Sequence, residues 1–132
     1  MKNAYKKRID EANVYDAAIK TPLQKQVNLS NRFNNNILLK REDLQPVFSF
    51  KVRGAYNKMA NLSKDKLVRG VISCSAGNHA QGVALAAQKL DCKALIVMPS
   101  TTPLIKIKAV EGLEAEVVLH GHTYHDAYNH VL

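Results

Sequence analysis

"GVISCSAGNHAQGVALAAQKLDCKALIVMP", residues 70–99, decides the fold because it reads as strand, helix and strand in succession. The short apolar blocks "GVISCS" and "KALIVMP" at its two ends are typical of strands. The run Ala94 to Met98 is apolar without alternation, as in strands that are covered on both faces. The stretch therefore predicts a β-α-β unit with parallel strands. Its helix is predicted from apolar residues at helical spacing: Ala80, Val83, Ala84 and Ala87.

The same alternation continues on both sides of this unit. The block "EAEVVLHG", residues 114–121, predicts a third strand. The fold class we expect is α/β, a parallel sheet with alternating helices. Three further helices are predicted from residues at helical spacing: Val52, Ala55, Tyr56 and Met59; Leu104, Ile107 and Val110; and Tyr124, Ala127, Tyr128 and Val131.

Capping residues agree with two of these helix starts. Thr102 is expected to be an N-cap, with Pro103 at the first helical position. Thr123 with Asp126 three residues later predicts a capping box.

The N-terminal region has a different character. Apolar residues at near-helical spacing predict one amphipathic helix across the first twenty residues, ended by Thr21 and Pro22. Residues 28–36 are polar and rich in asparagine, and "ILLK" at 37–40 predicts a short strand.

Composition limits the class of protein. The chain has 132 residues, 46% of them hydrophobic and 23% charged, which suits a globular domain with a core. Its longest apolar run, Ala94 to Met98, is too short to cross a bilayer, and no signal-like segment begins the chain, so we expect a cytoplasmic protein without membrane contact. The formal charge of +8 is scattered, which does not favour nucleic acid as a partner.

Cysteines and histidines do not predict a metal site. Cys74 and Cys92 fit no metal-ligand spacing and are expected to be buried free thiols. His120, His122 and His125 fall at a strand end, but nothing fixes them on one face, so a solvated loop is expected there.

The turn after the first strand of the sheet is a candidate ligand site. In open α/β sheets, ligands bind outside the carboxyl ends of the strands, where a helix N-terminus offers free N–H groups. Ser75 and Asn78 add side-chain donors, and Gly77 lets the backbone approach a ligand closely. The alternative interpretation is a plain strand-to-helix turn with Asn78 as its N-cap.

Lys51 opens another predicted helix, between Phe50 and Arg53. Helix starts favour anions, so a lysine there is either a solvated surface charge or an amine kept available for covalent chemistry. Spacing and composition leave both interpretations open.

A family resemblance favours the second. "KREDLQPVFSFKVRGAYNKM", "GVISCSAGNHAQGVALAAQKL" and "KALIVMPSTTPLIKIKAV" resemble the N-terminal part of the threonine dehydratase family, also called threonine ammonia-lyases. The likeness runs from about residue 21 to the end of the chain. "QPVFSFK", residues 45–51, is more similar to the biosynthetic form of the isoleucine pathway than to the catabolic form. The resemblance implies fold type II, a pyridoxal 5'-phosphate cofactor, a small amino-acid substrate and homo-oligomeric relatives.

The same resemblance implies roles for individual residues. Lys51 would bind the cofactor covalently and move the α-proton of the substrate, and Phe50 would pack near the cofactor ring. Asn78 would bind the ring hydroxyl. The substrate carboxylate would be held by Ser75, Ala76, Gly77, Asn78 and His79. Ala76 stands where related serine racemases have a serine base, which favours elimination of water over racemisation.

The resemblance also divides the chain. Residues 1–42 would be an arm that belongs to the large cofactor domain, and residues 43–132 would be most of the small α/β domain. The glycine-rich phosphate loop, the rest of the catalytic domain and the regulatory domain would lie outside this segment. We therefore expect a fragment with little turnover alone; the alternative is a non-catalytic remnant, or a small module that binds a ligand or a subunit.

Overall fold

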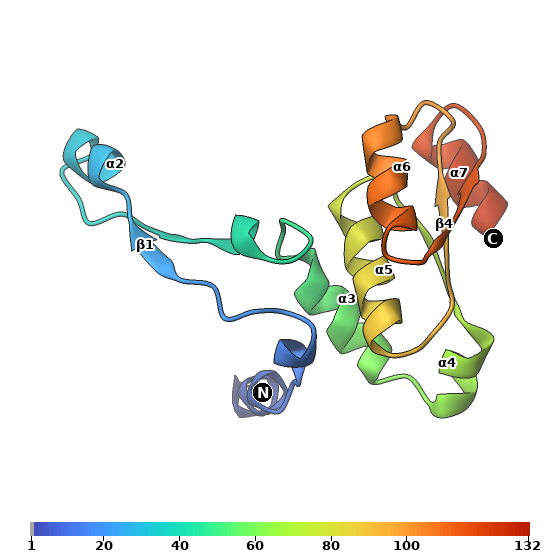
Figure 1. Cartoon of the computed structure of the whole chain (residues 1–132). Coiled ribbons are helices and arrows are strands. Elements are labelled where there is room, and N and C mark those ends of the chain that lie inside the picture. The colour runs from blue at the N-terminus through green and yellow to red at the C-terminus, as the bar shows by residue number, and fades with distance from the viewer. Residues whose placement is uncertain (1) are drawn as a thin grey trace.

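The computed structural model describes residues 2–132, and the side-chain surroundings of residues 4–132. An α/β unit carries an extended arm on one side (Figure 1). The arm consists of β1 (Leu23–Lys25), α2 (Val27–Arg32) and β2 (Leu38–Lys40). A short 3-10 helix, η2 (Glu42–Leu44), leads from the arm to the α/β unit.

The sheet of the α/β unit has three parallel strands, which confirms the predicted fold class. They are β3 (Val71–Cys74), β4 (Ala94–Met98) and β5 (Glu116–Leu119), in the order β3-β4-β5. The apolar run 94–98 is the central strand, and four of its five residues are buried. Its lack of alternation correctly indicated a strand covered on both faces.

Helices pack on both faces of this sheet. α3 (Lys51–Ala60), α5 (Asn78–Lys89) and α6 (Leu104–Glu111) lie on one side of β4, and α7 (Tyr124–Val131) lies on the other (Figure 1). Helical spacing predicted all four. The core between sheet and helices includes the alternate β4 residues Ala94, Ile96 and Met98, together with Val52, Ala55, Tyr56, Met59, Ala80, Val83, Ala84, Ala87 and Val110.

One predicted cap is confirmed and the other is wrong. Thr123 accepts a hydrogen bond from the Asp126 amide, and the Asp126 carboxylate accepts from the Thr123 amide, completing the capping box. Thr102 caps nothing. Its hydroxyl donates to the Pro99 carbonyl at 2.7 Å, and Pro103 itself is the N-cap of α6. Thr102 is buried and its hydroxyl is satisfied within the turn at 99–102, so the helix begins one residue later than expected.

The single helix predicted over the first twenty residues is wrong. α1 (Lys2–Asp10) is followed by a turn and by the 3-10 helix η1 (Val14–Asp16). Tyr5 and Ile9 are 65% and 72% exposed, so the apolar stripe of α1 packs on nothing that could extend it. The chain turns instead to bury Ala17 and Ala18 in the core.

The arm is a β-ribbon with a helix at its tip. β1 and β2 pair antiparallel, with Gln24 opposite Leu39. The strand predicted at 37–40 is confirmed as β2. β1, α2 and the short helix α4 (Lys64–Arg69) were not predicted. Among the described residues, no helix combines the length and the apolar character needed to cross a membrane.

Candidate functional site

Lys51 is the first residue of α3, and its side chain is exposed. Its Nζ lies 5.3 Å from the centre of the Phe50 ring. The approach to this helix start is tightly shaped: Phe48 has a left-handed backbone, with φ 54°, and Ser49 is buried. The Ser49 hydroxyl accepts a long hydrogen bond from the Lys51 amide, at 3.4 Å. An exposed amine beside an aromatic ring is thus presented at the end of a helix.

The turn between β3 and α5 lies at the carboxyl end of the sheet. The Ser75 amide donates to the Val97 carbonyl at 3.1 Å, which extends the β3-β4 pairing by one residue. The Gly77 amide donates to the Ser75 hydroxyl at 3.3 Å. Gly77 is the N-cap of α5 and Asn78 is its first helical residue, so the interpretation of Asn78 as an N-cap is wrong. Asn78 is exposed, and α5 has no side-chain capping hydrogen bond.

Gly82 brings α5 against the start of α3. A Cβ on Gly82 would lie 3.1 Å from the carbonyl carbon and oxygen of Lys51, closer than ordinary van der Waals contact. The bare backbone of Gly82 therefore permits this approach. α3 and α5 form the most extensive helix contact among the described residues (Figure 1). The helix beginning with Asn78 is thus packed directly on the backbone of Lys51.

The pKa of His79 is affected by its position near Lys51. Partial burial is the main cause that lowers the pKa of His79 from its usual value, and the positive charge of Lys51 lowers it further. The neutral imidazole is therefore favoured beside the lysine.

Two residues after Lys51 on α3, Arg53 forms an ion pair with Glu42 that was not predicted from the sequence. Arg53 donates to both carboxylate oxygens of Glu42, from Nε at 2.8 Å and from Nη2 at 2.9 Å. The hydrogen bonds from Arg53 are the main cause that lowers the Glu42 pKa to about 2. Thr21 and Gln45 also donate to this carboxylate. The sequence does not predict this pair, because Glu42 and Arg53 lie eleven residues apart and no periodicity relates them.

Comparison with known proteins identifies the family. The sequence model described as "Pyridoxal-phosphate dependent enzyme" matches residues 14–132. The chain belongs to the pyridoxal-phosphate dependent enzyme family. It is 62% identical over 123 residues to threonine dehydratase 1 biosynthetic, chloroplastic, of Solanum lycopersicum, covering 93% of this chain and 20% of that protein. It is 56% identical over 131 residues to L-threonine dehydratase biosynthetic IlvA of Burkholderia multivorans, covering 97% of this chain and 26% of that protein.

A solved structure shares this fold closely. The processed form of threonine deaminase isoform 2 from Solanum lycopersicum is 56% identical, with a TM-score of 0.94, over 97% of this chain and 35% of that one. This chain thus spans about a fifth to a quarter of the length of the curated relatives given above.

The residues present fit part of a pyridoxal-phosphate site. An exposed lysine amine can attach covalently to an aldehyde cofactor, and the neighbouring aromatic ring can pack on a cofactor ring, while α5, packed against the start of α3, offers backbone amides at its N-terminus. A phosphate loop is not evident, because no two of the six glycines lie within four residues of each other. We call the surface formed by Phe50, Lys51 and residues 75–79 the half-site.

The two cysteines and the histidines near the C-terminus are not part of the half-site. Cys74 and Cys92 are free, as predicted, but they are half-buried and not fully buried. Burial raises the pKa of both thiols, which disfavours the reactive thiolate. The rings of His120 and His130 stack at 3.9 Å between centroids. In the part of the chain that the structure describes, no three His, Cys, Asp or Glu side chains are grouped so as to hold a metal ion.

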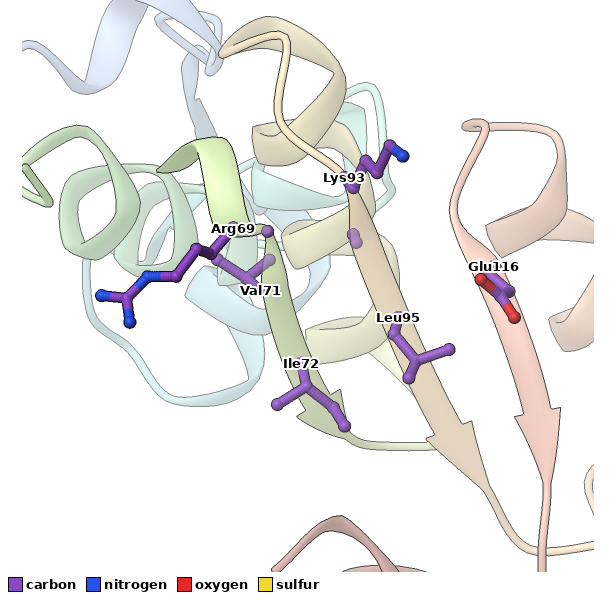
Figure 2. Close-up of a pocket in the computed structure, with 8 residues that line it drawn as sticks. Arg69, Val71, Ile72, Lys93, Leu95 and Glu116 are labelled. Atoms are coloured by element: carbon purple, nitrogen blue, oxygen red, sulfur yellow. The ribbon is translucent and has the colours of Figure 1, made fainter. Parts of the chain in front are cut away.

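A depression of about 260 Å³ lies at the opposite end of the sheet from the half-site. It is open to solvent at the amino ends of β3, β4 and β5, with Ile72 and Leu95 on its floor and Arg69, Lys93 and Glu116 around it (Figure 2). Ligands of open α/β sheets bind at the carboxyl ends of strands, so this depression does not compete with the half-site as a candidate.

Proposed function

We propose that this chain carries the lysine half of a pyridoxal-phosphate-dependent threonine dehydratase site. The observation that carries the proposal is the start of α3, where the exposed Lys51 is packed through its backbone on Gly82 of α5. That contact holds the helix that begins at Lys51, the last residue of "SFK", against the helix that begins within "SAGNH". The family resemblance links both motifs to the cofactor.

Each residue of the half-site would act on a different group. Lys51 would bind the cofactor through its amine and then, as a base, take the α-proton of the substrate. Phe50 would pack on the cofactor ring, and Asn78 would donate to the ring hydroxyl. Ser75 and the backbone amides of residues 76–79 would hold the substrate carboxylate. When bound, the cofactor supplies an electron sink for the charge that develops at the α-carbon.

The proposed reaction is the deamination of L-threonine. Removal of the α-proton and departure of the β-hydroxyl as water, followed by hydrolysis, convert threonine to 2-oxobutanoate and ammonia. The relatives named biosynthetic threonine dehydratases favour a role in the first step of isoleucine biosynthesis over a role in threonine catabolism. Ala76 carries no hydroxyl, so residue 76 cannot act as a second base, and racemisation is disfavoured.

The rest of the enzyme is part of the proposal. Residues 1–42 would pack with a large cofactor domain, and residues 43–132 would form most of the small domain. The remaining part would supply the phosphate loop, and the whole would act as a homo-oligomer in the cytoplasm. The exposure of Phe50, Lys51 and Asn78 supports this view, because one side of the half-site is uncovered. Another part of the enzyme could pack there as the second wall of the site.

A second candidate is a non-catalytic module that binds a small ligand or another subunit. The same exposure favours it, since an open surface excludes no water from reacting groups. The two candidates differ in whether Lys51 is needed for turnover once the second wall is present.

The test supplies that wall. The chain would be co-expressed with the remainder of the Burkholderia multivorans relative, meaning the part that follows its matched segment, and 2-oxobutanoate formation from L-threonine would be measured with pyridoxal phosphate. We expect turnover from the co-purified pair, none from either piece alone, and none from a pair with Lys51→Ala. Lys58→Ala, on the exposed side of the same helix, is the matched control and should retain turnover.

A co-purified pair without turnover, or turnover that survives Lys51→Ala, would favour the non-catalytic module. Turnover of L-serine to pyruvate at a higher rate would leave the lyase chemistry standing and correct the substrate.

A further inference from the structure

We propose that Glu42 and Arg53 are positioning residues, which fix the start of α3 and thereby the place of Lys51. We call this pair the Glu42–Arg53 latch. Its effect on α3 follows from contacts within this chain, and only its consequence for cofactor attachment rests on the proposed function.

The latch is a two-pronged ion pair with little access to solvent. Nε and Nη2 of Arg53 donate to separate oxygens of Glu42 at 2.8 and 2.9 Å. The side chains of Arg53 and Glu42 are 24% and 16% exposed. A guanidinium fork on a carboxylate fixes both distance and orientation, which a single-point contact cannot do.

The latch also ties the base of the arm to α3. The Thr21 hydroxyl donates to Glu42 at 2.5 Å, and the buried Gln45 amide donates to Glu42 at 3.1 Å. Gln45 exchanges two hydrogen bonds with the backbone of Ile19, both at 2.9 Å. The chain therefore enters and leaves the arm through one polar cluster next to α3 (Figure 1).

Apart from its packing on α5, the start of α3 has few polar anchors within its own segment, where the hydrogen bond from the Lys51 amide to the Ser49 hydroxyl is long, at 3.4 Å. Its N-cap, Phe50, makes no side-chain capping bond, and the first turn contains no acidic residue. Lys51 and Arg53 instead place two cations where the helix dipole is positive. Glu42 supplies from another segment the negative charge that this turn lacks.

Lys51 therefore lies within a segment of the chain whose two ends are held together. The latch joins the ends of residues 42–53, and Val47 and Ser49 are buried within this segment. Lys51 lies two residues before Arg53, and a Cβ on Gly82 would lie 3.1 Å from its carbonyl, so the two helices are already close there. Loosening the latch frees the first turn of α3 to move relative to α5.

The test uses the full chain and two readouts. Arg53→Lys keeps the charge but loses the fork, and Glu42→Gln keeps the shape but loses the charge. Asp43→Asn is the matched control, because it removes the neighbouring exposed ion pair with Arg41. The first readout is hydrogen exchange of residues 49–56 compared with residues 83–98. The second is the share of pyridoxal phosphate trapped by borohydride at Lys51 among all lysines.

We expect both latch variants to exchange about tenfold faster at 49–56, with 83–98 unchanged, because a charge-assisted fork is lost. We also expect the share trapped at Lys51 to fall several-fold, while Asp43→Asn behaves like the wild type. The two readouts can also separate. If the latch variants exchange faster only at 49–56 but the wild type shows no preference for Lys51 in trapping, the result would support the latch and count against the proposed function.

Two results would overturn the latch as a positioning device. One is exchange that stays unchanged, or that rises equally at 83–98, because the pair would then contribute only general stability or none. The other is a wild-type preference for Lys51 that both variants retain in full.

Discussion

The fold strongly favours the charged form of Glu42. The hydrogen bonds from Arg53 are the largest cause of its lowered pKa, burial opposes them, and the donors on Thr21 and Gln45 add to them. The result is a pKa of about 2, against a usual value of 4.5. The folded protein therefore stabilises the ionised form of Glu42 relative to its protonated form.

This shift predicts how stability depends on pH. Because the folded-state pKa is depressed, the stabilisation is present above the usual pKa and is lost as the pH falls from about 4.5 towards about 2. In urea unfolding at neutral pH, Glu42→Gln should lower the free energy of unfolding by about 2 kcal/mol. That difference should shrink towards zero near the lower pH. A difference that does not change with pH would contradict the assignment of the shift to this carboxylate.

Individual residues differ in how well the sequence predicts their role in the site. Lys51 and the 75–79 turn were found because each lies within a short motif at the edge of a predicted element. The latch was missed because Glu42 and Arg53 come from different segments and no periodicity relates them. Asn78 was given a possible capping role that Gly77 holds instead, since several polar and small residues of that turn could cap the helix.

At the scale of elements, the contact between α3 and α5 depends on Gly82. Alanine normally stabilises a helix interior relative to glycine, but here the new Cβ would lie 3.1 Å from the Lys51 carbonyl. One helix must then move by a few tenths of an ångström.

We therefore expect Gly82→Ala to destabilise the protein by about 1 kcal/mol in urea unfolding, because overpacking outweighs helix propensity. Gly54→Ala is the matched control: nothing lies within 4 Å of its Cβ position on α3, so it should stabilise by up to about 1 kcal/mol. Equal stabilisation by both substitutions would contradict the close approach of the two helices.

Elements with strong periodicity and a core to face were predicted well. α3 and α5 bury all the residues that predicted them, and β4 buries four of its five. α7 was predicted correctly although it buries only Ala127, because Tyr124 and Tyr128 are exposed. The N-terminal helix was predicted too long because the spacing of Tyr5 and Ile9 cannot show whether a partner surface exists. β1 and α2 escaped prediction because their residues are mostly exposed, so neither carries a hydrophobic pattern.

At the scale of the whole molecule, the arm and the sheet differ in how well the sequence predicts them. The parallel sheet followed from the alternation of elements, whereas the direction in which the arm projects is set by the polar cluster at its base (Figure 1). Large apolar side chains are exposed on both parts, including Phe33 and Phe48 at 61% and 76%. Such exposure suits a chain that spans a fifth to a quarter of its relatives' length and shares their fold.

The measurement that tests the central claim most directly is the location of the cofactor. The purified chain would be incubated with pyridoxal phosphate and reduced with borohydride, and the modified peptide would be identified by mass spectrometry in the wild type, Lys51→Ala and Lys58→Ala. We predict one dominant adduct, at Lys51, which is lost in Lys51→Ala and kept in Lys58→Ala. Adducts spread evenly over the surface lysines, or unchanged by Lys51→Ala, would contradict the assignment of Lys51 as the cofactor lysine.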